Sequence, residues 1–350
     1  MLILVINPGS ASTKVALYRR DQCLARETLF HSEEELAAGS QLDARGRAVR
    51  AFLAASGTPL SRVTAIAARG GLLGPVRGGT YRVNGAMLED LAAARRGHHA
   101  SNLGGLIAAE LAREAHCPAY VVDPVSVDEL EPWARVSGWK ELERQSLFHA
   151  LNSRAVARCA ARELGKSYGE VNLIVAHLGS GISVSAHRRG RVVDVANPND
   201  EGPFSTERSG GLPARQVIAL ALAGSEENCE FTTRGGLYGY LGTRDATEVE
   251  KRIRAGDGYA ALVYRALAYQ VAREIGAMAA VLFGQVDAVV LTGGLAWSEL
   301  LTTHIVNQIG FMALILRYPG ENEMEALALG VVRVLEGEEE PGIYGAGPAD

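Results

Sequence analysis

Short apolar runs alternate along the chain with segments in which apolar residues recur at helical spacing. The runs at Leu2–Ile6, Thr13–Tyr18, Val63–Ala68 and Ala119–Val122 predict strands, and Leu103–Ala115 predicts a helix. Strands that alternate with helices are typical of an α/β fold. The first third of the chain therefore predicts an α/β domain.

The pattern that opens the chain recurs near its middle. The apolar run Leu173–Ala176 leads into a turn of small residues at His177–Gly181, and Ile182–Ala186 follows as a second strand. A pair of arginines then precedes a third run, Arg191–Val195, just as Arg19-Arg20 follows the second strand of the first half. This repetition over half a chain length predicts two related halves rather than a solenoid of short repeats.

The last third of the chain has a third glycine turn and a terminal helix. Thr292–Gly294 follows the apolar run Ala288–Leu291. Apolar spacing then predicts a last helix at about Glu323–Leu335. The acidic end from Glu336 to Asp350 contains Pro and Gly and is expected to be a frayed tail.

Composition narrows the functional classes. Apolar residues make up 47% and charged residues 21% of the 350, as in an ordinary globular protein of two domains. The net charge of -5, with basic residues spread out, argues against nucleic-acid binding.

The apolar start is interrupted at once by Asn7, so it predicts a buried strand rather than a signal peptide, and no apolar run reaches membrane-spanning length. The four widely spaced cysteines, Cys23, Cys117, Cys159 and Cys229, are expected to be reduced thiols of a cytoplasmic protein.

Three glycine-containing turns after strands predict phosphate binding. Backbone N–H groups in such turns bind phosphate oxygens without needing charged side chains nearby. The first turn, Asn7 to Lys14, also supplies an amide, hydroxyls and an ammonium group. The chain lacks the P-loop pattern and a convincing dinucleotide-binding fingerprint, so neither of those folds is expected.

Longer motifs resemble the acetate and butyrate kinases. V-I-N-P-G-S-A-S-T-K at 5–14 and A-H-L-G-S-G-I-S-V at 176–184 resemble both. Four others resemble the butyrate kinases in particular: H-A-S-N-L-G-G at 99–105, V-V-D-P-V at 121–125, F-H-A-L-N at 148–152 and E-G-P-F-S-T-E-R-S-G-G-L-P at 201–213. The resemblance runs from residue 1 to about 335.

The resemblance implies the fold, the cofactors and the assembly. It implies two ribonuclease-H-like domains of the actin and Hsp70 type around a nucleotide cleft, with ATP, Mg²⁺ and a homodimer or higher homo-oligomer. We expect residues 1–147 and a returning segment 318–350 to form the first domain. Residues 148–317 are expected to form the nucleotide-binding second domain.

The chemistry of acyl phosphate formation explains which residue types are needed. Two negatively charged reactants must be brought in line, so positioning and preorganised positive charge supply most of the catalysis. A planar guanidinium holds such oxygens bidentately, and the carboxylate nucleophile is already ionised at neutral pH. By resemblance, Arg208 acts on the transferring phosphoryl group, and His149 donates to the transition-state oxygens. Arg69 either holds the substrate carboxylate or is structural, because Ile66 stands where acetate kinases have an active-site arginine.

Two carboxylates and an amide are matched to the family's metal side. Asp123 follows a strand and is expected to contact Mg²⁺ directly or through water, and it is also a candidate catalytic residue. Asn7 matches the family's first-loop asparagine. Glu323 is the candidate carboxylate on the returning helix, and Glu325 is the competing alternative.

The remaining matched residues are assigned to the nucleotide. His177 is placed near the phosphates, and Arg244 is a candidate to stack on the adenine. The loop residues assigned to phosphates or adenosine are Gly9, Ser10, Ser12, Lys14, Gly179, Ser180, Gly181, Gly293 and Gly294. His99 remains open, because His98 beside it blurs the match.

The sequence thus predicts a cytoplasmic kinase that forms butyryl phosphate from ATP and butyrate or isobutyrate, and that binds neither nucleic acid nor membrane. A relative that prefers acetate, propionate or branched acids is the near alternative, because one methylene changes binding by only about 1–3 kcal/mol. A catalytically silent nucleotide-binding regulator of the same fold is an alternative of another class. A sugar kinase is a third, although the motifs do not match that group.

Overall fold

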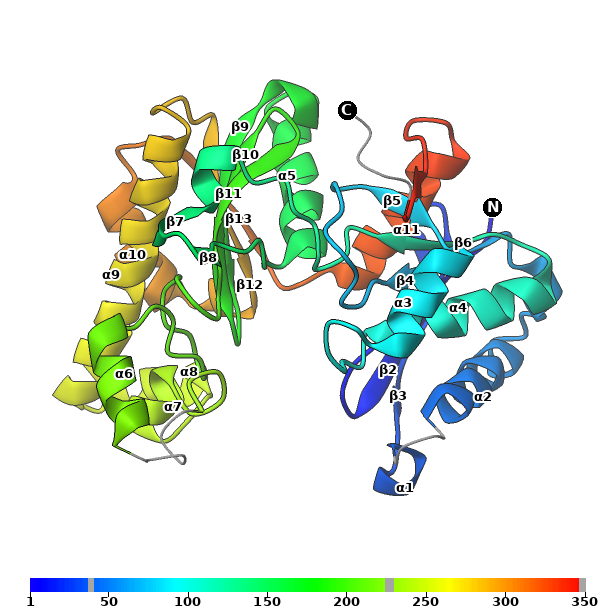
Figure 1. Ribbon diagram of the computed structural model, residues 1–350, viewed down its shortest axis with the longest axis horizontal. Coiled ribbons are helices and arrows are strands. Elements are labelled where there is room, and N and C mark those ends of the chain that lie inside the picture. Colours follow the sequence, from blue (N-terminus) through cyan, green and yellow to red (C-terminus); the bar gives the residue numbers. More distant parts are fainter. Residues whose placement is uncertain (37–40, 224–229, 346–350) are drawn as a thin grey trace. The chain divides into compact units, whose positions relative to one another are not determined.

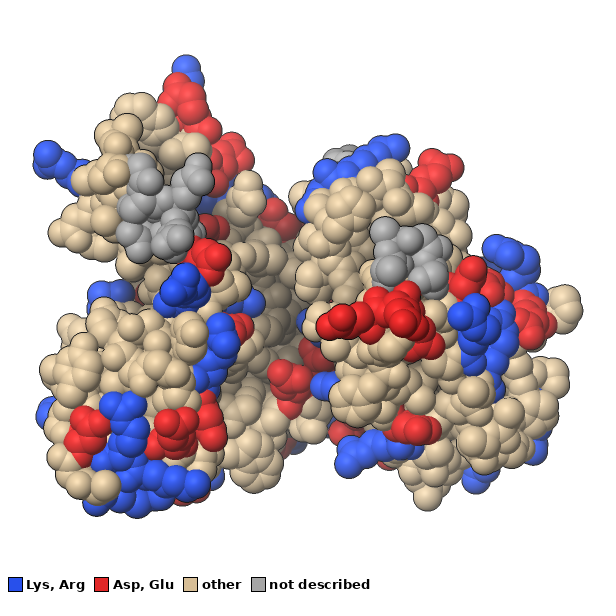
Figure 2. All heavy atoms as spheres, turned by 90° about the horizontal axis from the view of Figure 1, so that it is seen from below, with Lys and Arg blue, Asp and Glu red and all other residues tan. Residues whose placement is uncertain are grey.

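The structure, a computed structural model, describes residues 1–36, 41–223 and 230–345. Cys229 and the last five residues of the expected tail lie outside the described residues. Within the described ranges, no helix combines the length and the apolar character needed to cross a membrane. On the face drawn in Figure 2, basic and acidic side chains lie interspersed rather than in separate patches.

The chain divides into two compact units (Figure 1). Unit 1 contains Met1–Val127 and Asn322–Asp350, and unit 2 contains Asp128–Glu321. The segment 128–147, which the sequence places with the first domain, is tied to unit 2. The Glu131 backbone N–H donates to the Val193 carbonyl, and Arg144 is ion-paired with Asp194 at 3.0 Å.

Unit 1 contains a seven-stranded sheet in the order β14-β5-β6-β4-β1-β2-β3. Its strands are β1 (Ile3–Pro8), β2 (Ser12–Arg19), β3 (Gln22–Phe30), β4 (Ala65–Arg69), β5 (Thr80–Arg82), β6 (Ala119–Val122) and β14 (Gly342–Ile343). Its helices are α1 (Glu33–Leu36), α2 (Gln41–Ala55), α3 (Gly85–Ala93), α4 (Asn102–Ala115) and α11 (Glu323–Leu335).

Unit 2 contains a five-stranded sheet in the order β11-β10-β9-β12-β13. These strands are β9 (Asn172–Leu178), β10 (Ile182–Arg188), β11 (Arg191–Ala196), β12 (Ala288–Gly293) and β13 (Leu314–Pro319), and a small hairpin is formed by β7 (Val136–Trp139) and β8 (Leu142–Glu143). The helices are α5 (Ala150–Glu163), α6 (Ala214–Leu222), α7 (Gly236–Leu241), α8 (Ala246–Arg254), α9 (Gly258–Val281) and α10 (Glu299–Ile309).

Five strands of each unit follow the same plan. In unit 1, β1 pairs antiparallel with β2 and parallel with β4, β2 pairs antiparallel with β3, and β4 pairs parallel with β6. In unit 2, β9 has the same relations to β10 and β12, β10 to β11, and β12 to β13. The repeated halves that the sequence predicts are therefore confirmed at the level of strand order and direction.

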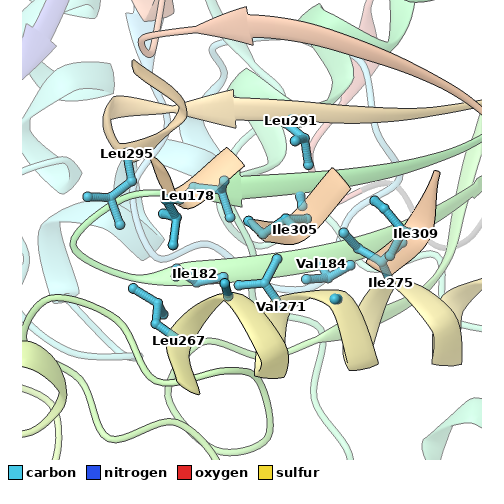
Figure 3. Packing of buried hydrophobic residues seen from close by; sticks show 14 of the residues in the cluster. Leu178, Ile182, Val184, Leu267, Val271, Ile275, Leu291, Leu295, Ile305 and Ile309 are labelled. Atoms are coloured by element: carbon cyan, nitrogen blue, oxygen red, sulfur yellow. The ribbon is translucent and has the colours of Figure 1, made fainter. Parts of the chain in front are cut away.

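The two faces of each central sheet are covered by different helices. A side chain on Gly105 of α4 would approach Val121, whereas one on Gly330 of α11 would meet Val122. Successive side chains of a strand point to opposite faces, so α4 and α11 cover opposite faces of this sheet. In unit 2, Leu267, Val271 and Ile275 of α9 pack against Ile182 and Val184 of β10 (Figure 3). The other face of that sheet packs against α5.

The C-terminal segment differs from the expected frayed tail. Gly342–Ile343 pairs in parallel with β5. The Tyr344 hydroxyl accepts a hydrogen bond from the Gly74 N–H at 2.8 Å and donates one to Asp90. Paired backbone groups and a half-buried phenol thus hold this segment on unit 1 through residue 344. The expectation of fraying from Glu336 onwards was wrong there.

Candidate functional site

Three sequence-predicted residues lie at strand ends at one edge of the unit 1 sheet, and a fourth begins the helix that packs on these strands. The registers Ile6↔Ala68 and Arg69↔Val122 place Asn7, Arg69 and Asp123 just beyond or at the ends of three parallel strands. Glu323 begins α11, which packs on these strands. The carboxyl ends of parallel strands are where ligands bind in α/β sheets.

The Glu323 carboxylate joins two of these residues. Its Oε2 accepts hydrogen bonds from Asn7 Nδ2 at 2.7 Å and from Arg69 Nη1 at 3.2 Å. The side chain of Asn7 lies on the same face of β1 as those of Ile3 and Val5, and α11 covers that face. The strand period therefore explains why a residue of the first strand meets one 316 positions later.

Asp123 is held in a strained backbone conformation directly after β6. Its φ of 37° lies in the left-handed region, which is costly for a residue with a side chain. The Asp123 N–H donates to the Gly79 carbonyl at 2.9 Å, and Asp123 Oδ1 accepts from the Gly79 N–H at 2.8 Å. These two bonds stabilise the conformation and fix a buried carboxylate at the sheet edge.

The first predicted phosphate turn is a tight loop between β1 and β2. The Gly9 N–H donates to the Ser12 carbonyl at 2.7 Å, and Ser10 and Ala11 are exposed at the tip. Lys14 is exposed and stands opposite Asn7 in the strand register. The loop therefore presents backbone N–H groups and hydroxyls beside an ammonium group, as the sequence predicts.

A buried arginine that sequence reasoning missed lies behind this loop. Arg45 of α2 is 1% exposed and donates to the Ser10 carbonyl at 3.0 Å, the Ser12 carbonyl at 2.9 Å and the Thr13 hydroxyl at 2.8 Å. The available signal was its place on the apolar face of α2, one turn before Val49.

His99 and Asn102 shape the loop after β4. His99 Nδ1 is 2.6 Å from the Ser101 hydroxyl, and burial, assisted by the nearby charge of Arg69, lowers the pKa of His99. Asn102 Oδ1 accepts from the Leu72 N–H at 2.9 Å, and a side chain on Gly71 would collide with Asn102. His99 therefore belongs to the surroundings of Arg69.

The corresponding edge of the unit 2 sheet carries two stacked imidazoles. The rings of His149 and His177 lie 3.8 Å apart at an interplanar angle of 11°. His177 Nδ1 is 2.7 Å from Asn152 Oδ1, and His149 Nδ1 is 2.9 Å from the Ser183 hydroxyl. Because Asn152 Oδ1 is only an acceptor, His177 Nδ1 carries the proton and donates this bond. The two predicted histidines are thus brought together.

Arg208 packs directly on the second glycine turn. A side-chain carbon on Gly181 would lie 2.8 Å from Arg208 Cζ, so any larger residue would force the guanidinium to shift. Arg208 Nη1 donates to Asn199 Oδ1 at 2.7 Å, and burial lowers the pKa of Arg208. The predicted catalytic arginine and the predicted phosphate turn therefore form one constellation, and Asn199 is a member that sequence reasoning missed.

The segment around Arg208 is fastened to the same turn. The Arg208 N–H donates to the Ser205 hydroxyl at 3.0 Å, and that hydroxyl donates to the Ser180 carbonyl. This single hydroxyl fixes the spacing between the arginine and the turn.

The third glycine turn ends β12. Gly293 has a φ of 87°, and a side chain there would lie 2.4 Å from the Leu178 carbonyl oxygen at the end of β9. Gly293 and Gly320 exchange two backbone hydrogen bonds. The positive φ and the close approach to Leu178 both require glycine at position 293. A side-chain carbon on Gly294, in contrast, would meet no atom within 4 Å.

Arg244 is engaged by its own neighbours. Its guanidinium lies 4.2 Å from the centre of the Tyr238 ring, is ion-paired with Glu207 at 2.9 Å, and donates to the Thr233 carbonyl. Stacking of Arg244 on adenine stays a prediction.

The donor set fits a magnesium ion better than a transition metal. Among the described residues, no group of three or more His, Cys, Asp or Glu side chains has metal-binding geometry. Mg²⁺ binds through one or two carboxylates and keeps waters or phosphate oxygens as its other ligands. The Glu323 carboxylate with the Asn7 amide, and the buried Asp123 at the same edge, are hard oxygen donors of that kind.

Solved structures share this fold over nearly the whole chain. A propionate kinase from Francisella tularensis matches with a TM-score of 0.77 and 21% identity, over 94% of this chain and 98% of that chain. An acetate kinase from Porphyromonas gingivalis matches with a TM-score of 0.81 and 19% identity, over 95% and 99%. A putative N-acetylmannosamine kinase from Listeria monocytogenes matches less well, with a TM-score of 0.53 and 14% identity, over 97% and 100%.

These likenesses confirm the predicted α/β fold with two domains. A protein-family model described as the acetokinase family matches residues 139–318, which is just over half of the chain. The matched range holds the stacked histidines, Arg208 and the second and third glycine turns. The chain belongs to the acetokinase family.

Proposed function

We propose that this protein is a butyrate kinase that transfers the γ-phosphoryl group of ATP directly to butyrate or isobutyrate, giving the acyl phosphate and ADP. The observation that carries the proposal is the contact between Arg208 and the Gly179–Gly181 turn. A protein that only binds nucleotide needs no guanidinium packed against its phosphate turn. A kinase needs one, because negative charge spreads over the phosphoryl oxygens during transfer.

The site residues of each unit then have a distinct task. In unit 2, Arg208 and the turn hold the phosphoryl oxygens, while His149 and His177 supply further hydrogen bonds to them. In unit 1, Arg69 holds the substrate carboxylate, since its guanidinium is partly exposed beside the partly buried Glu323. Asn7, Asp123 and Glu323 would hold Mg²⁺. When bound, that ion neutralises charge on the phosphate oxygens.

No base is assigned, because the attacking carboxylate is ionised at neutral pH. This is a chemical difference from sugar kinases, which activate a hydroxyl group. The preference for butyrate rests on the four motifs at 99–105, 121–125, 148–152 and 201–213. An acetate, propionate or branched-acid kinase is the alternative, and family membership supports it equally well.

We also propose a cytoplasmic homodimer or higher homo-oligomer. In unit 2 several large apolar side chains are more than 60% exposed, among them Trp133, Val136, Trp139 and Leu142 on and beside the β7–β8 hairpin. Burial against a second copy would remove this surface from water. Cys23, Cys117 and Cys159 are free thiols, as expected for a reducing compartment.

Trapping of the acyl phosphate as a hydroxamate tests the function. The purified protein is incubated with Mg-ATP, hydroxylamine and one acid at a time from formate to hexanoate, with glucose and N-acetylmannosamine as controls. We expect hydroxamate from C2–C5 acids with a maximum at butyrate or isobutyrate, and no ADP release that depends on sugar. Sugar-dependent ADP release without hydroxamate would contradict the proposal.

A further inference from the structure

Arg45 of α2 is a buried cation behind the first glycine turn. Within residues 1–36, 41–223 and 230–345 no acidic side chain is ion-paired with it, and its acceptors are two backbone carbonyls and one hydroxyl. An isolated buried charge is costly, so a protein keeps one only where something compensates for it. The carbonyl dipoles do this in part.

The neighbouring His31 does not compensate for the positive charge of Arg45. Its Nε2 lies 2.9 Å from the Thr13 hydroxyl, which in turn accepts from Arg45. Burial and the charge of Arg45 lower the pKa of His31, so the ring is neutral at pH 7. The nearby acid, Glu35, lies 3.9 Å from His31 Nδ1 on the side of the ring away from Thr13.

The hydrogen bonds of Arg45 orient the loop. In a planar trans peptide the carbonyl and the following N–H point in opposite directions. The Ser10 carbonyl points inward to Arg45, so the Ala11 N–H points outward, and both residues are exposed at the tip of the loop. The Ser12 carbonyl accepts from both Arg45 and Gly9, which closes the turn. The result is an outward N–H group above a buried positive charge, and that arrangement favours an anion.

We propose that Arg45 is a positioning residue for the phosphoryl-transfer reaction. It holds the Gly9–Ser12 turn in its phosphate-binding conformation, and the phosphate that binds there supplies the missing counter-charge. This inference rests on the proposed function of the turn. Arg45 lies on α2, outside the sequence motifs described above, so the inference adds a new residue to those proposed to act in phosphoryl transfer.

Substitution of Arg45 by Met and by Lys tests the inference, with Arg50→Met as the matched control. Arg50 lies on the same helix and ties it to Glu110 and Glu114 of α4, away from the loop. We expect Arg45→Met to lower kcat for acyl phosphate formation about 10- to 100-fold, since a small misplacement of a reacting group has costs of that order. Arg45→Lys keeps the charge but lacks the fork, so it should recover only part of the loss.

Thermal unfolding separates positioning from folding. Mg-ATP should raise the Tm of wild type and Arg50→Met equally, and should raise the Tm of Arg45→Met by about half as much or less. If Arg45→Met folds too poorly to measure, Arg45→Lys is judged on the same two readouts. A variant that loses Tm but keeps both the wild-type kcat per folded molecule and the full Mg-ATP shift would overturn the inference.

The two proposals fail in different ways. If wild type forms no hydroxamate with any acid, the butyrate kinase proposal falls. The Arg45 inference is then still decided by the Mg-ATP shift, which requires no acyl acceptor. An equal shift in Arg45→Met and Arg50→Met would refute it, and a selective loss in Arg45→Met would support it.

Discussion

The two central strands, β1 of unit 1 and β9 of unit 2, place different chemistry at the same position. Asn7 and His177 each precede the last residue of their strand, and each contacts the helix that covers its face. Asn7 donates to Glu323 of α11, and His177 donates to Asn152 of α5, both at 2.7 Å. The same topology has therefore been kept with different side chains.

The strands next to β1 and β9 also carry different side chains at corresponding positions. Lys14 stands opposite Asn7 on β2, and Ser183 stands opposite His177 on β10. One strand further, Arg69 and Asn7 each follow the last register pair, Ile6↔Ala68, and Thr292 pairs with His177. Unit 1 thus places ionised groups at its strand ends. Unit 2 places imidazole and hydroxyl groups there, and its half-buried Arg208 comes from a loop outside the sheet. The shared topology specifies the positions, and the side chains at these positions differ between the two units.

The largest expected effect falls on unit 2. Arg208→Ala should lower kcat on the order of a hundredfold or more, because one preorganised donor to the transition state is lost. Arg208→Lys should restore little, since an ammonium group lacks the bidentate fork. Initial rates of hydroxamate formation at saturating substrates measure this.

The control is Arg254→Ala, an exposed arginine of unit 2 that is paired with Glu250. It should retain the wild-type kcat. If Arg208→Ala kept kcat and only unfolded more easily, Arg208 would be structural, and Arg69 would become the candidate catalytic arginine.

Acid should affect unit 2 through His187, a fully buried imidazole on β10. His187 takes the place on β10 that Tyr18 takes on β2. Burial, together with Arg154 and Arg158, lowers the pKa of His187 from 6.5 to about 3. Between these values the unfolded chain binds the extra proton, so stability is full above pH 6.5 and falls as the pH drops. From pH 7 to pH 5 this group alone should remove about 2 kcal/mol.

Urea unfolding followed by tryptophan fluorescence measures this loss. Trp133, Trp139 and Trp297 are the three tryptophans of the chain and all belong to unit 2. His187→Gln should flatten the pH dependence by about the same amount. An unchanged pH dependence in that variant would show that other groups cause the acid sensitivity.

A smaller effect is expected at the metal side of unit 1. Glu323→Gln should raise the Mg²⁺ concentration for half-maximal rate about tenfold, because a ligand charge is lost while the hydrogen-bonding shape is kept. Glu325→Gln is the matched control two residues along the same helix, and it should leave the Mg²⁺ dependence unchanged. The reverse result would assign the metal to Glu325.

The smallest effect concerns the acid. From acetate to butyrate, each added methylene should raise kcat/KM by up to about fourfold, which corresponds to about 0.8 kcal/mol of buried surface. Arg69→Gln should raise the KM of every acid by a similar factor, since it removes the contact with the carboxylate and not with the acyl chain. A profile in which acetate is best would place the protein with the acetate kinases.

Several elements followed directly from the sequence. Strand Ala119–Val122 and helix Glu323–Leu335 have the predicted bounds. Strands β2, β9 and β10 differ from prediction only by short extensions, and β1 begins one residue later and ends two residues later than predicted. These segments carry strong period-2 or period-3.6 patterns, or continuous apolar runs between turns. The motif residues Arg208 and Gly181 were also identified as separate features, and the structure adds that they touch.

Other features depended on contacts far apart in the chain. The tail through Tyr344 looks polar and flexible in sequence, yet it is ordered by β5 and Asp90. Arg45 looks like an ordinary helical arginine, because nothing local shows that its helix packs behind the first turn.

The sequence by itself thus determined the strand and helix order, the duplication of the halves, and the residue types of the phosphate turns, because these depend on local periodicity and on motifs of neighbouring residues. Only the tertiary structure decided that Glu323 meets Asn7 and Arg69, that His149 stacks on His177, and that Arg45 supports the loop. Those pairings depend on which helix covers which sheet face. That choice is made by the packing of whole apolar surfaces, which no short segment of sequence encodes.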